Sequence, residues 1–152
     1  MQTPHWTVYL QALLTPVIAF FAVYVAASQW STARNKLRLD LFEKRYAVYE
    51  AAQEFIASIV TSGKVNDESM FTYMAATRAA KWIVSHEVEE YLERELYTPA
   101  LKLQTLQSML EGVPAGDERT KNVARQLELK THFNAQYKQL DIWFSAYLQL
   151  SH

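Results

Sequence analysis

The feature that most constrains this chain is an uncharged segment near its N-terminus. Residues 1–30 contain no Asp, Glu, Lys or Arg. Within them, Thr7 to Ser28 reads TVYLQALLTPVIAFFAVYVAAS, a run of 22 residues without a charge. As an α-helix this run reaches about 33 Å, enough to cross the ~30 Å hydrocarbon layer of a bilayer. The sequence therefore predicts a transmembrane helix, with residues 1–30 as an N-terminal anchor.

Aromatic residues flank the predicted span at both ends. Trp6 and Tyr9 lie at one end, and Tyr24 and Trp30 lie at the other. The amphipathic rings of Trp and Tyr favour the headgroup region of a membrane, so we expect these four residues at the two interfaces. Pro16 lies inside the span, where a membrane helix tolerates it.

Two other interpretations of the segment remain open. It could be a core helix, although a helix this long and apolar on every face is hard to cover in a 152-residue protein. It could also be a cleaved signal peptide, because Val25 and Ala27 fit the small positions before a cleavage site. Against that, no basic residue precedes the apolar run, and the run exceeds the roughly 7 to 15 residues typical of signal peptides. A retained anchor is the favoured interpretation.

Basic residues predict the orientation of the anchor. His5 is the only ionisable side chain before the span. Five basic residues follow it closely: Arg34, Lys36, Arg38, Lys44 and Arg45. Because basic residues stay on the cytoplasmic side, we expect the N-terminus outside and residues 31–152 in the cytoplasm. The same cluster would attract anionic headgroups, worth about 1 kcal/mol per residue near the surface, although a solvated charged face is the simpler interpretation.

The rest of the chain predicts an all-α fold. Only three glycines and four prolines occur, too few for the turns of an all-β protein. Neither residue occurs between Pro16 and Gly63, so the anchor helix is expected to continue through KLRLDL (residues 36–41) despite its strand-like alternation. We expect an N-terminal transmembrane helix that continues into an antiparallel helical bundle, residues 31–152.

Breaks and caps divide the expected bundle into helices. The first helix should stop at Gly63, and Asn66 or Asp67 should cap a second that ends near Val84. Further caps are expected at Ser85, at Thr98 before Pro99, and at Asp117. In the first helix, apolar and aromatic residues recur at intervals of three, four or seven positions. This spacing predicts a core-facing stripe of Leu39, Phe42, Tyr46, Tyr49, Ile56 and Val60. The last helix is expected to run through Val123, Leu127, Phe133, Tyr137, Leu140, Phe144, Tyr147 and Leu148.

No motif for catalysis or cofactor binding is found. The chain has no cysteine, and its isolated glycines form neither a phosphate-binding GxxxxGK loop nor a GxGxxG loop. His86 and Glu90 stand four residues apart and could share a metal, but a solvated acidic helix start is favoured because no second ligand pair is evident. The sequence therefore predicts no cofactor, no metal and no enzyme activity.

Aromatic residues raise the question of nucleic-acid binding. Candidates for a stacking surface are Tyr46, Tyr49, Tyr137, Trp143, Phe144 and Tyr147. Their helical spacing favours an ordinary core, and the net charge of −1 provides no general attraction to nucleic acid. We expect no nucleic-acid partner and no small-molecule substrate.

Small residues of the predicted span share one helical face. Ala12, Thr15, Ala19, Ala22 and Ala26 follow one another by three, four, three and four residues. Such faces let membrane helices approach closely, although an alanine-rich segment also produces this pattern by chance. A protein partner or a second copy of the chain is therefore expected at the membrane, in addition to the lipid bilayer.

Residues 29–57, QWSTARNKLRLDLFEKRYAVYEAAQEFI, carry a resemblance. They resemble a segment of small uncharacterised bacterial single-pass membrane proteins, in which an N-terminal anchor precedes a pattern like QWxTAxxKLxLDLFxKRxxVY. The matching positions are Gln29, Trp30, Thr32, Ala33, Lys36, Leu37, Leu39, Asp40, Leu41, Phe42, Lys44, Arg45, Val48 and Tyr49. The likeness covers about the first 60 residues, and it implies a bacterial inner-membrane location without implying any activity.

Three classes of function are compatible with these features. A membrane-anchored interaction or scaffold protein fits best, because it requires an anchor and a helical bundle but no reactive group. An oligomeric membrane effector that acts on membrane integrity is the alternative, suggested by Pro16 and the small-residue face. An enzyme is the third class, and it would need a polar pocket with a perturbed acid or base.

Overall fold

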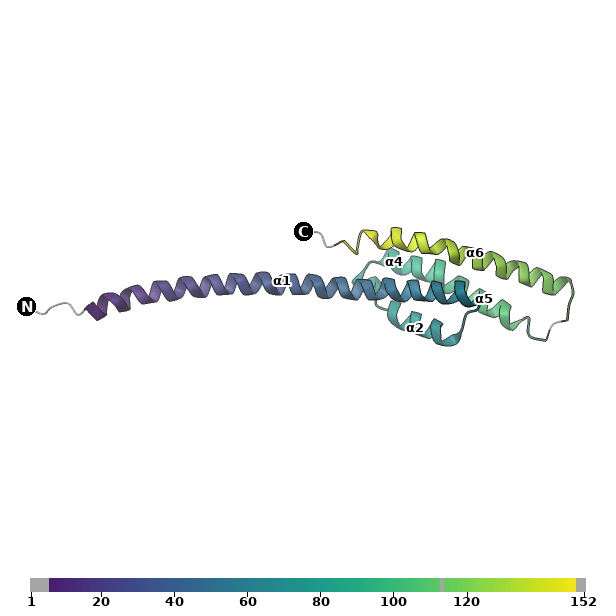
Figure 1. The fold of residues 1–152 in the computed structure, drawn as a ribbon, viewed down its shortest axis with the longest axis horizontal. Coiled ribbons are helices and arrows are strands. Elements are labelled where there is room, and N and C mark those ends of the chain that lie inside the picture. Colours follow the sequence, from purple (N-terminus) through teal and green to yellow (C-terminus); the bar gives the residue numbers. More distant parts are fainter. Residues whose placement is uncertain (1–5, 113, 150–152) are drawn as a thin grey trace, which may run out of the picture. The chain divides into compact units, whose positions relative to one another are not determined.

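The protein is all-α. The structure is a computed structural model that describes residues 6–112 and 114–149, and the side chains of residues 6–13 and 15 lie outside that description. It divides into two compact units, Met1–Asp40 and Leu41–His152. Within the described ranges every element is helical and no strand occurs, which confirms the predicted fold class (Figure 1). Helix α1, Trp6–Ser62, includes the KLRLDL segment, so the prediction that this segment is helical is correct.

Glycine ends α1 where the sequence indicates. Gly63 has a φ of 66°, in the left-handed region that only glycine enters without strain, and its N–H donates to the Ile59 carbonyl at 2.8 Å. Helix α2, Asp67–Thr77, then begins with Asn66 as its cap. The Asn66 Oδ1 accepts a hydrogen bond from the Ser69 N–H at 2.6 Å, as an N-cap side chain does.

The second helix is shorter than predicted. Instead of running to Val84, α2 ends at Thr77, and a separate turn of helix, α3, spans Ala80–Ile83. The backbone of Ala79 leaves the helical region between them, with φ −91° and ψ 0°. This break places Ala80 entirely within the core, and we attribute the shortening to that packing.

The next segment contains a π-helical turn caused by a proline. It consists of α4 (His86–Tyr91), the π-helix η1 (Leu92–Tyr97) and α5 (Thr98–Ser108). Pro99 has no N–H, so the Glu95 carbonyl four residues earlier has no α-helical donor. The wider turn accommodates this, with the Thr98 N–H donating to the Glu93 carbonyl. The chain thus deviates at Pro99 as expected, but the predicted cap at Thr98 is wrong, because Tyr97 before α5 is itself helical and makes no capping bond.

Of the remaining two predicted caps, the one at Ser85 is confirmed and the one at Asp117 is wrong. The Ser85 Oγ accepts from the Val88 N–H at 3.2 Å and caps α4 as expected. In contrast, the last helix, α6 (Asp117–Ser145), begins after Gly116, and no side chain caps it. Asp117 instead lies in the first turn with Glu118, where carboxylates stabilise the positive end of a helix.

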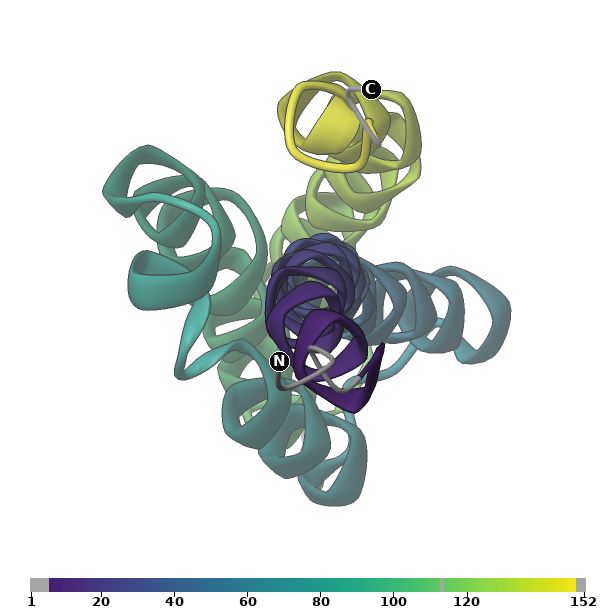
Figure 2. The same cartoon turned by 90° about the vertical axis from the view of Figure 1, so that its left-hand side faces the viewer.

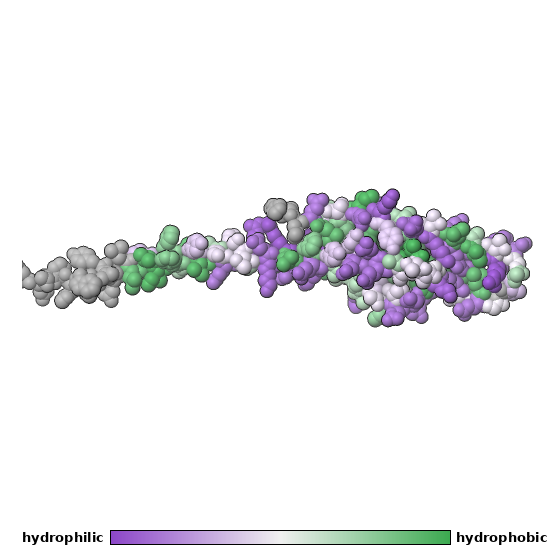
Figure 3. All heavy atoms as spheres, in the orientation of Figure 1, coloured by the Kyte–Doolittle hydropathy of each residue, from purple (hydrophilic) through white to green (hydrophobic). Residues whose placement is uncertain are grey.

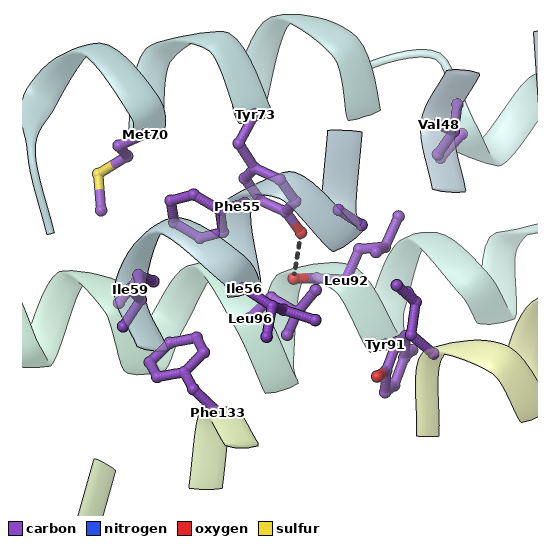
Figure 4. Packing of buried hydrophobic residues seen from close by; sticks show 14 of the residues in the cluster. Val48, Phe55, Ile56, Ile59, Met70, Tyr73, Tyr91, Leu92, Leu96 and Phe133 are labelled. Carbon is purple, nitrogen blue, oxygen red and sulfur yellow. Dashed lines mark hydrogen bonds between the residues drawn. The ribbon is translucent and has the colours of Figure 1, made fainter. Parts of the chain in front are cut away.

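The second unit is an antiparallel bundle. Its helical segments alternate in direction in the order α1 from Leu41, α2, α4–η1–α5 and α6 (Figure 1). Seen end on, α2 and α6 lie on opposite sides of this bundle (Figure 2). Side chains from all of these segments fill the core, including Phe55, Tyr73, Leu96 and Phe133 (Figure 4).

The structure corrects the predicted core-facing stripe of α1 and shows which apolar residues of α6 are buried. On α1 the buried residues are Val48, Ala52, Phe55, Ile56 and Ile59, so of the predicted stripe only Ile56 is buried. Leu39, Tyr46 and Val60 are exposed, whereas Phe42 and Tyr49 are partly buried. On α6, Phe133, Leu140 and Phe144 are buried, but Val123 and Leu127 are exposed. Several apolar stripes fit the same helical period, and only the neighbouring helices select one of them.

Candidate functional site

The N-terminal part of α1 presents an uninterrupted apolar surface. Leu14 and every residue from Pro16 to Ser28 have exposed side chains, and none of these residues is charged. Phe20 is 74% exposed, and Phe21, Val23 and Tyr24 are exposed to a similar degree. Figure 3 shows this stretch as a green, hydrophobic surface. Water-soluble proteins rarely expose a contiguous apolar patch of this extent, and such patches are typical of surfaces that contact a membrane or another protein.

This surface contradicts the core-helix interpretation. By length and composition, α1 is long and apolar enough to cross a membrane, and none of its most apolar described window is buried. A core helix of the same chain would be mostly buried. A signal peptide would present the same surface as a retained anchor. The mass of the mature chain distinguishes the two, because a cleaved signal peptide would be missing from it.

The predicted interfacial aromatics are only partly described. Tyr24 and Trp30 are exposed on α1. Trp6 and Tyr9 belong to the same helix, but their side chains lie outside the described residues. Trp6 and Trp30 are 24 residues apart, which corresponds to about 36 Å along a helix, so they are spaced as two interfaces of a bilayer require.

The basic cluster divides into two kinds of residue. Arg34, Lys36, Arg38 and Lys44 are exposed, as headgroup-facing residues would be. Among the described residues, Lys36, Asp40 and Lys44 form no ion pair with one another, although the sequence spacing favours one. These side chains are therefore available to solvent or to lipid.

Arg45 has a different, structural role. Its Nε donates to the Ile83 carbonyl at 2.9 Å and its Nη1 donates to the Tyr147 carbonyl at 3.4 Å. Its guanidinium also lies 6.0 Å from the centre of the Tyr147 ring. Because Ile83 ends α3 and Tyr147 follows α6, one side chain of α1 connects the ends of two other helices. The guanidinium of Arg45 therefore joins helices within the bundle.

The small-residue face lies partly outside the described side chains. Ala19, Ala22 and Ala26 are exposed on α1. Ala12 and Thr15 belong to α1, but their side chains are outside the described residues.

A polar network joins α4 and η1 to α6. The His132 Nε2 lies 2.8 Å from the Glu95 carbonyl, the one that Pro99 leaves without a helical donor. The Tyr91 hydroxyl donates to Gln136 Oε1 at 2.8 Å, and Trp143 stacks on the Tyr91 ring. Burial raises the pKa of Tyr91 above its usual range, which keeps the hydroxyl protonated as a donor. The sequence carried one signal for this network, a proline four residues after Glu95.

An open groove lies between α2 and the α4–η1 segment. Its volume is about 550 Å³. One wall comes from α2 and α3, through Phe71, Met74, Arg78 and Lys81. The facing wall comes from α4 and η1, through Glu89, Glu93 and Tyr97. Sequence reasoning missed this groove because its two walls come from segments that only the fold brings together, and Phe71 and Met74 are both exposed.

The considered metal pair is not formed. The His86 Nδ1 lies 2.9 Å from Glu89 Oε2, and Glu90 instead pairs with Arg94 at 3.4 Å. Across the described residues, no group of three or more metal-ligating side chains comes together.

Comparisons of the chain with protein-family models, with curated proteins and with solved structures gave no match.

Proposed function

We propose that this chain is a single-pass membrane protein that holds a helical interaction module at the cytoplasmic face of a bacterial inner membrane. Residues 1–30 act as the anchor, and the bundle from Leu41 onwards is the module. The observation that carries the proposal is the fully exposed apolar surface of α1 from Pro16 to Ser28.

Lipid is the partner that suits this surface. Removing a large apolar side chain from water contributes about 1.5–3 kcal/mol, so Phe20, Phe21 and Val23 together favour burial strongly. The segment is helical, so its backbone groups bond within the helix as a lipid environment demands, except that Pro16 leaves the Ala12 carbonyl without an α-helical donor, which membrane helices tolerate. A partner protein would have to surround the helix on every face to provide the same cover.

The flanking charges support the proposed orientation. The 16 residues after Ser28 include four exposed basic residues, Arg34, Lys36, Arg38 and Lys44. The described residues before Ser28 carry no charge. The positive-inside tendency then places the bundle in the cytoplasm.

An interaction module accounts for the bundle better than an enzyme does. The buried core holds the helices in fixed positions, and some polar side chains of the bundle, such as Arg45, join helices. The open groove beside α2 provides a surface for another molecule. A scaffold needs these two features and no reactive group.

Cysteine accessibility tests location and orientation together. The chain has no natural cysteine, so single Thr3→Cys and Lys138→Cys variants give unambiguous labelling. In intact cells, a membrane-impermeant maleimide should label the Thr3→Cys variant, whereas the Lys138→Cys variant should react only after lysis. Alkaline carbonate should leave both in the membrane pellet, and the intact mass should include residues 1–27. Labelling of Lys138→Cys from outside would reject the orientation, and a mass lacking the anchor would identify a signal peptide.

An oligomeric membrane effector is a second candidate. The exposed Ala19, Ala22 and Ala26 allow close helix approach within a bilayer, and α1 remains helical through Pro16. This candidate predicts dye leakage from cells or vesicles that contain the full-length chain, and the leakage should fall in the Ala19→Leu, Ala22→Leu double variant. A scaffold produces no leakage in either form.

A further inference from the structure

The groove beside α2 has two walls that run along helices. Phe71, Met74 and Arg78 follow one another by three and four residues on one wall, and Glu89, Glu93 and Tyr97 follow by four and four on the other. Side chains with this spacing line up along a helix, so the groove is an elongated trough. From Phe71 to Arg78 it extends over seven residues, or about 10 Å, the length of two helical turns.

The two walls are held apart at a fixed distance. At the floor, the Tyr73 hydroxyl donates to the Leu92 carbonyl at 2.9 Å (Figure 4). Tyr73 is buried and its ring stacks on Phe55, so this bond is anchored in the core. At one end, Lys81 and Glu89 form an ion pair at 3.8 Å across the groove. The trough therefore exists before anything binds, which lowers the cost of binding.

The lining combines apolar contact area with unpaired charges of both signs. Phe71 is 74% exposed and Met74 is exposed beside it, an adaptable apolar surface. Among the described residues, the side chains of Arg78 on one wall and Glu93 on the other form no ion pair and no hydrogen bond. An occupant that complements both walls must carry an acidic edge toward Arg78 and a basic edge toward Glu93.

We infer that this groove binds an amphipathic helix of a partner protein, with an apolar face in the trough, an acidic edge toward Arg78 and a basic edge toward Glu93. Apolar residues at i, i+3 or i+4, and i+7 span two turns and match the length of the walls. The inference rests on the proposed function as an interaction module, and it specifies the class of partner.

An anionic lipid fits the same groove less well. Its acyl chain could contact Phe71 and Met74, but its headgroup would meet Glu89 and Glu93 as well as Arg78 and Lys81. A helix can place opposite charges on its two edges, whereas a single anionic headgroup cannot.

The test uses the full-length protein in nanodiscs and a displayed library of helix-biased 14-residue peptides as the probe. Selected peptides should share the i, i+3 or i+4, i+7 apolar pattern with acidic and basic residues on opposite edges. The Phe71→Asp variant should weaken their binding at least tenfold. The Arg78→Glu variant should also weaken binding, and a peptide whose acidic edge is changed to Lys should recover it. Leu127→Asp and Arg125→Glu, matched exposed positions on α6, should bind as the wild type does.

Four outcomes would overturn the inference. They are failure to select any binder, selected peptides that bind Phe71→Asp as tightly as wild type, displacement of the peptides by anionic phospholipid vesicles, and wild-type self-association that Phe71→Asp abolishes. The last two would assign the groove to lipid or to a second copy of this chain. Membrane insertion of the Phe71→Asp variant should match wild type, so a failed groove and a failed anchor give different results.

Discussion

Helix α1 contains two apolar stretches that differ in what covers them. The stretch from Pro16 to Ser28 exposes every side chain, whereas Val48, Ala52, Phe55 and Ile59 in the later stretch are almost entirely buried. Both stretches are helical and both are rich in large apolar residues. The difference lies in their polar residues, because the later stretch interleaves charged residues such as Glu50 and Glu54 on its solvent side and the earlier stretch has none.

The two parts of α1 therefore suit two different environments. A stripe of apolar residues needs only a protein neighbour along one side, whereas a helix that is apolar all round needs cover on every side. The bundle satisfies the first requirement with α2, the α4–η1–α5 segment and α6. The second requirement is what the proposed bilayer supplies.

Removal of the first stretch should have the largest effect. A chain without residues 1–30 loses the exposed apolar surface but retains the whole second unit. It should be monodisperse in buffer without detergent, as measured by sedimentation velocity, whereas the full-length chain should require detergent or lipid. A full-length chain that stays monodisperse without detergent would remove the basis of the comparison.

The same substitution in the two stretches should differ sharply in its effect on the bundle. Phe55 is 2% exposed and stacks on Tyr73, so Phe55→Ala should lower the free energy of unfolding by about 3–5 kcal/mol. Phe20→Ala, at an exposed position, should change it by less than about 0.5 kcal/mol. Urea unfolding in detergent micelles, followed by near-ultraviolet circular dichroism, measures both. Equal effects would show that the two stretches share one cooperative unit.

The basic residues provide a second matched pair. Arg45→Met should lower the free energy of unfolding by about 1–2 kcal/mol, because the Ile83 and Tyr147 carbonyls lose their donors. Arg34→Met, at an exposed position of the first unit, should leave bundle stability unchanged. Thermal unfolding in the same micelles compares the two variants. If Arg34→Met destabilises the bundle as much as Arg45→Met does, Arg45 has no structural role that distinguishes it from the exposed basic residues.

The tyrosines should give the smallest effect, together with a pH signature. The Tyr49 hydroxyl donates to Asp141 Oδ1 at 2.7 Å, and this bond to a carboxylate, with burial, raises the pKa of Tyr49 to about 12. Below pH 10 the folded and unfolded forms are both protonated, so the contribution of Tyr49 is fully present there. Above pH 10 the unfolded form ionises first, and the contribution is lost as pH rises to about 12.

Comparison of Tyr49→Phe with wild type isolates that contribution from those of the other tyrosines. Tyr49→Phe should cost about 1 kcal/mol at pH 8, and the gap to wild type should narrow between pH 10 and 12. Tyr24→Phe, in the first stretch, should follow the wild-type curve. Urea midpoints at several pH values provide the measurement. A gap that stays constant up to pH 12 would contradict the role given to the Asp141 bond.

Local signals in the sequence determined where several helices begin and end. Gly63 ends α1 because only glycine adopts its positive φ without strain, and Asn66 and Ser85 cap the next helices because their side chains reach the free N–H groups two or three residues on. Composition alone also distinguished the apolar segment before Ser28 from the rest of the chain. These features depend only on residues that are close along the chain.

Tertiary contacts decided the rest. The choice of Val48 and Phe55 over Leu39 and Tyr46 as core residues, and the use of Arg45 between α3 and α6, depend on partners that lie far along the chain. The groove likewise exists only because α2 and η1 meet at the Tyr73–Leu92 bond. Helical periodicity fixes which residues share a face, but the neighbouring helices determine which face loses its water, since burial is a property of two surfaces in contact.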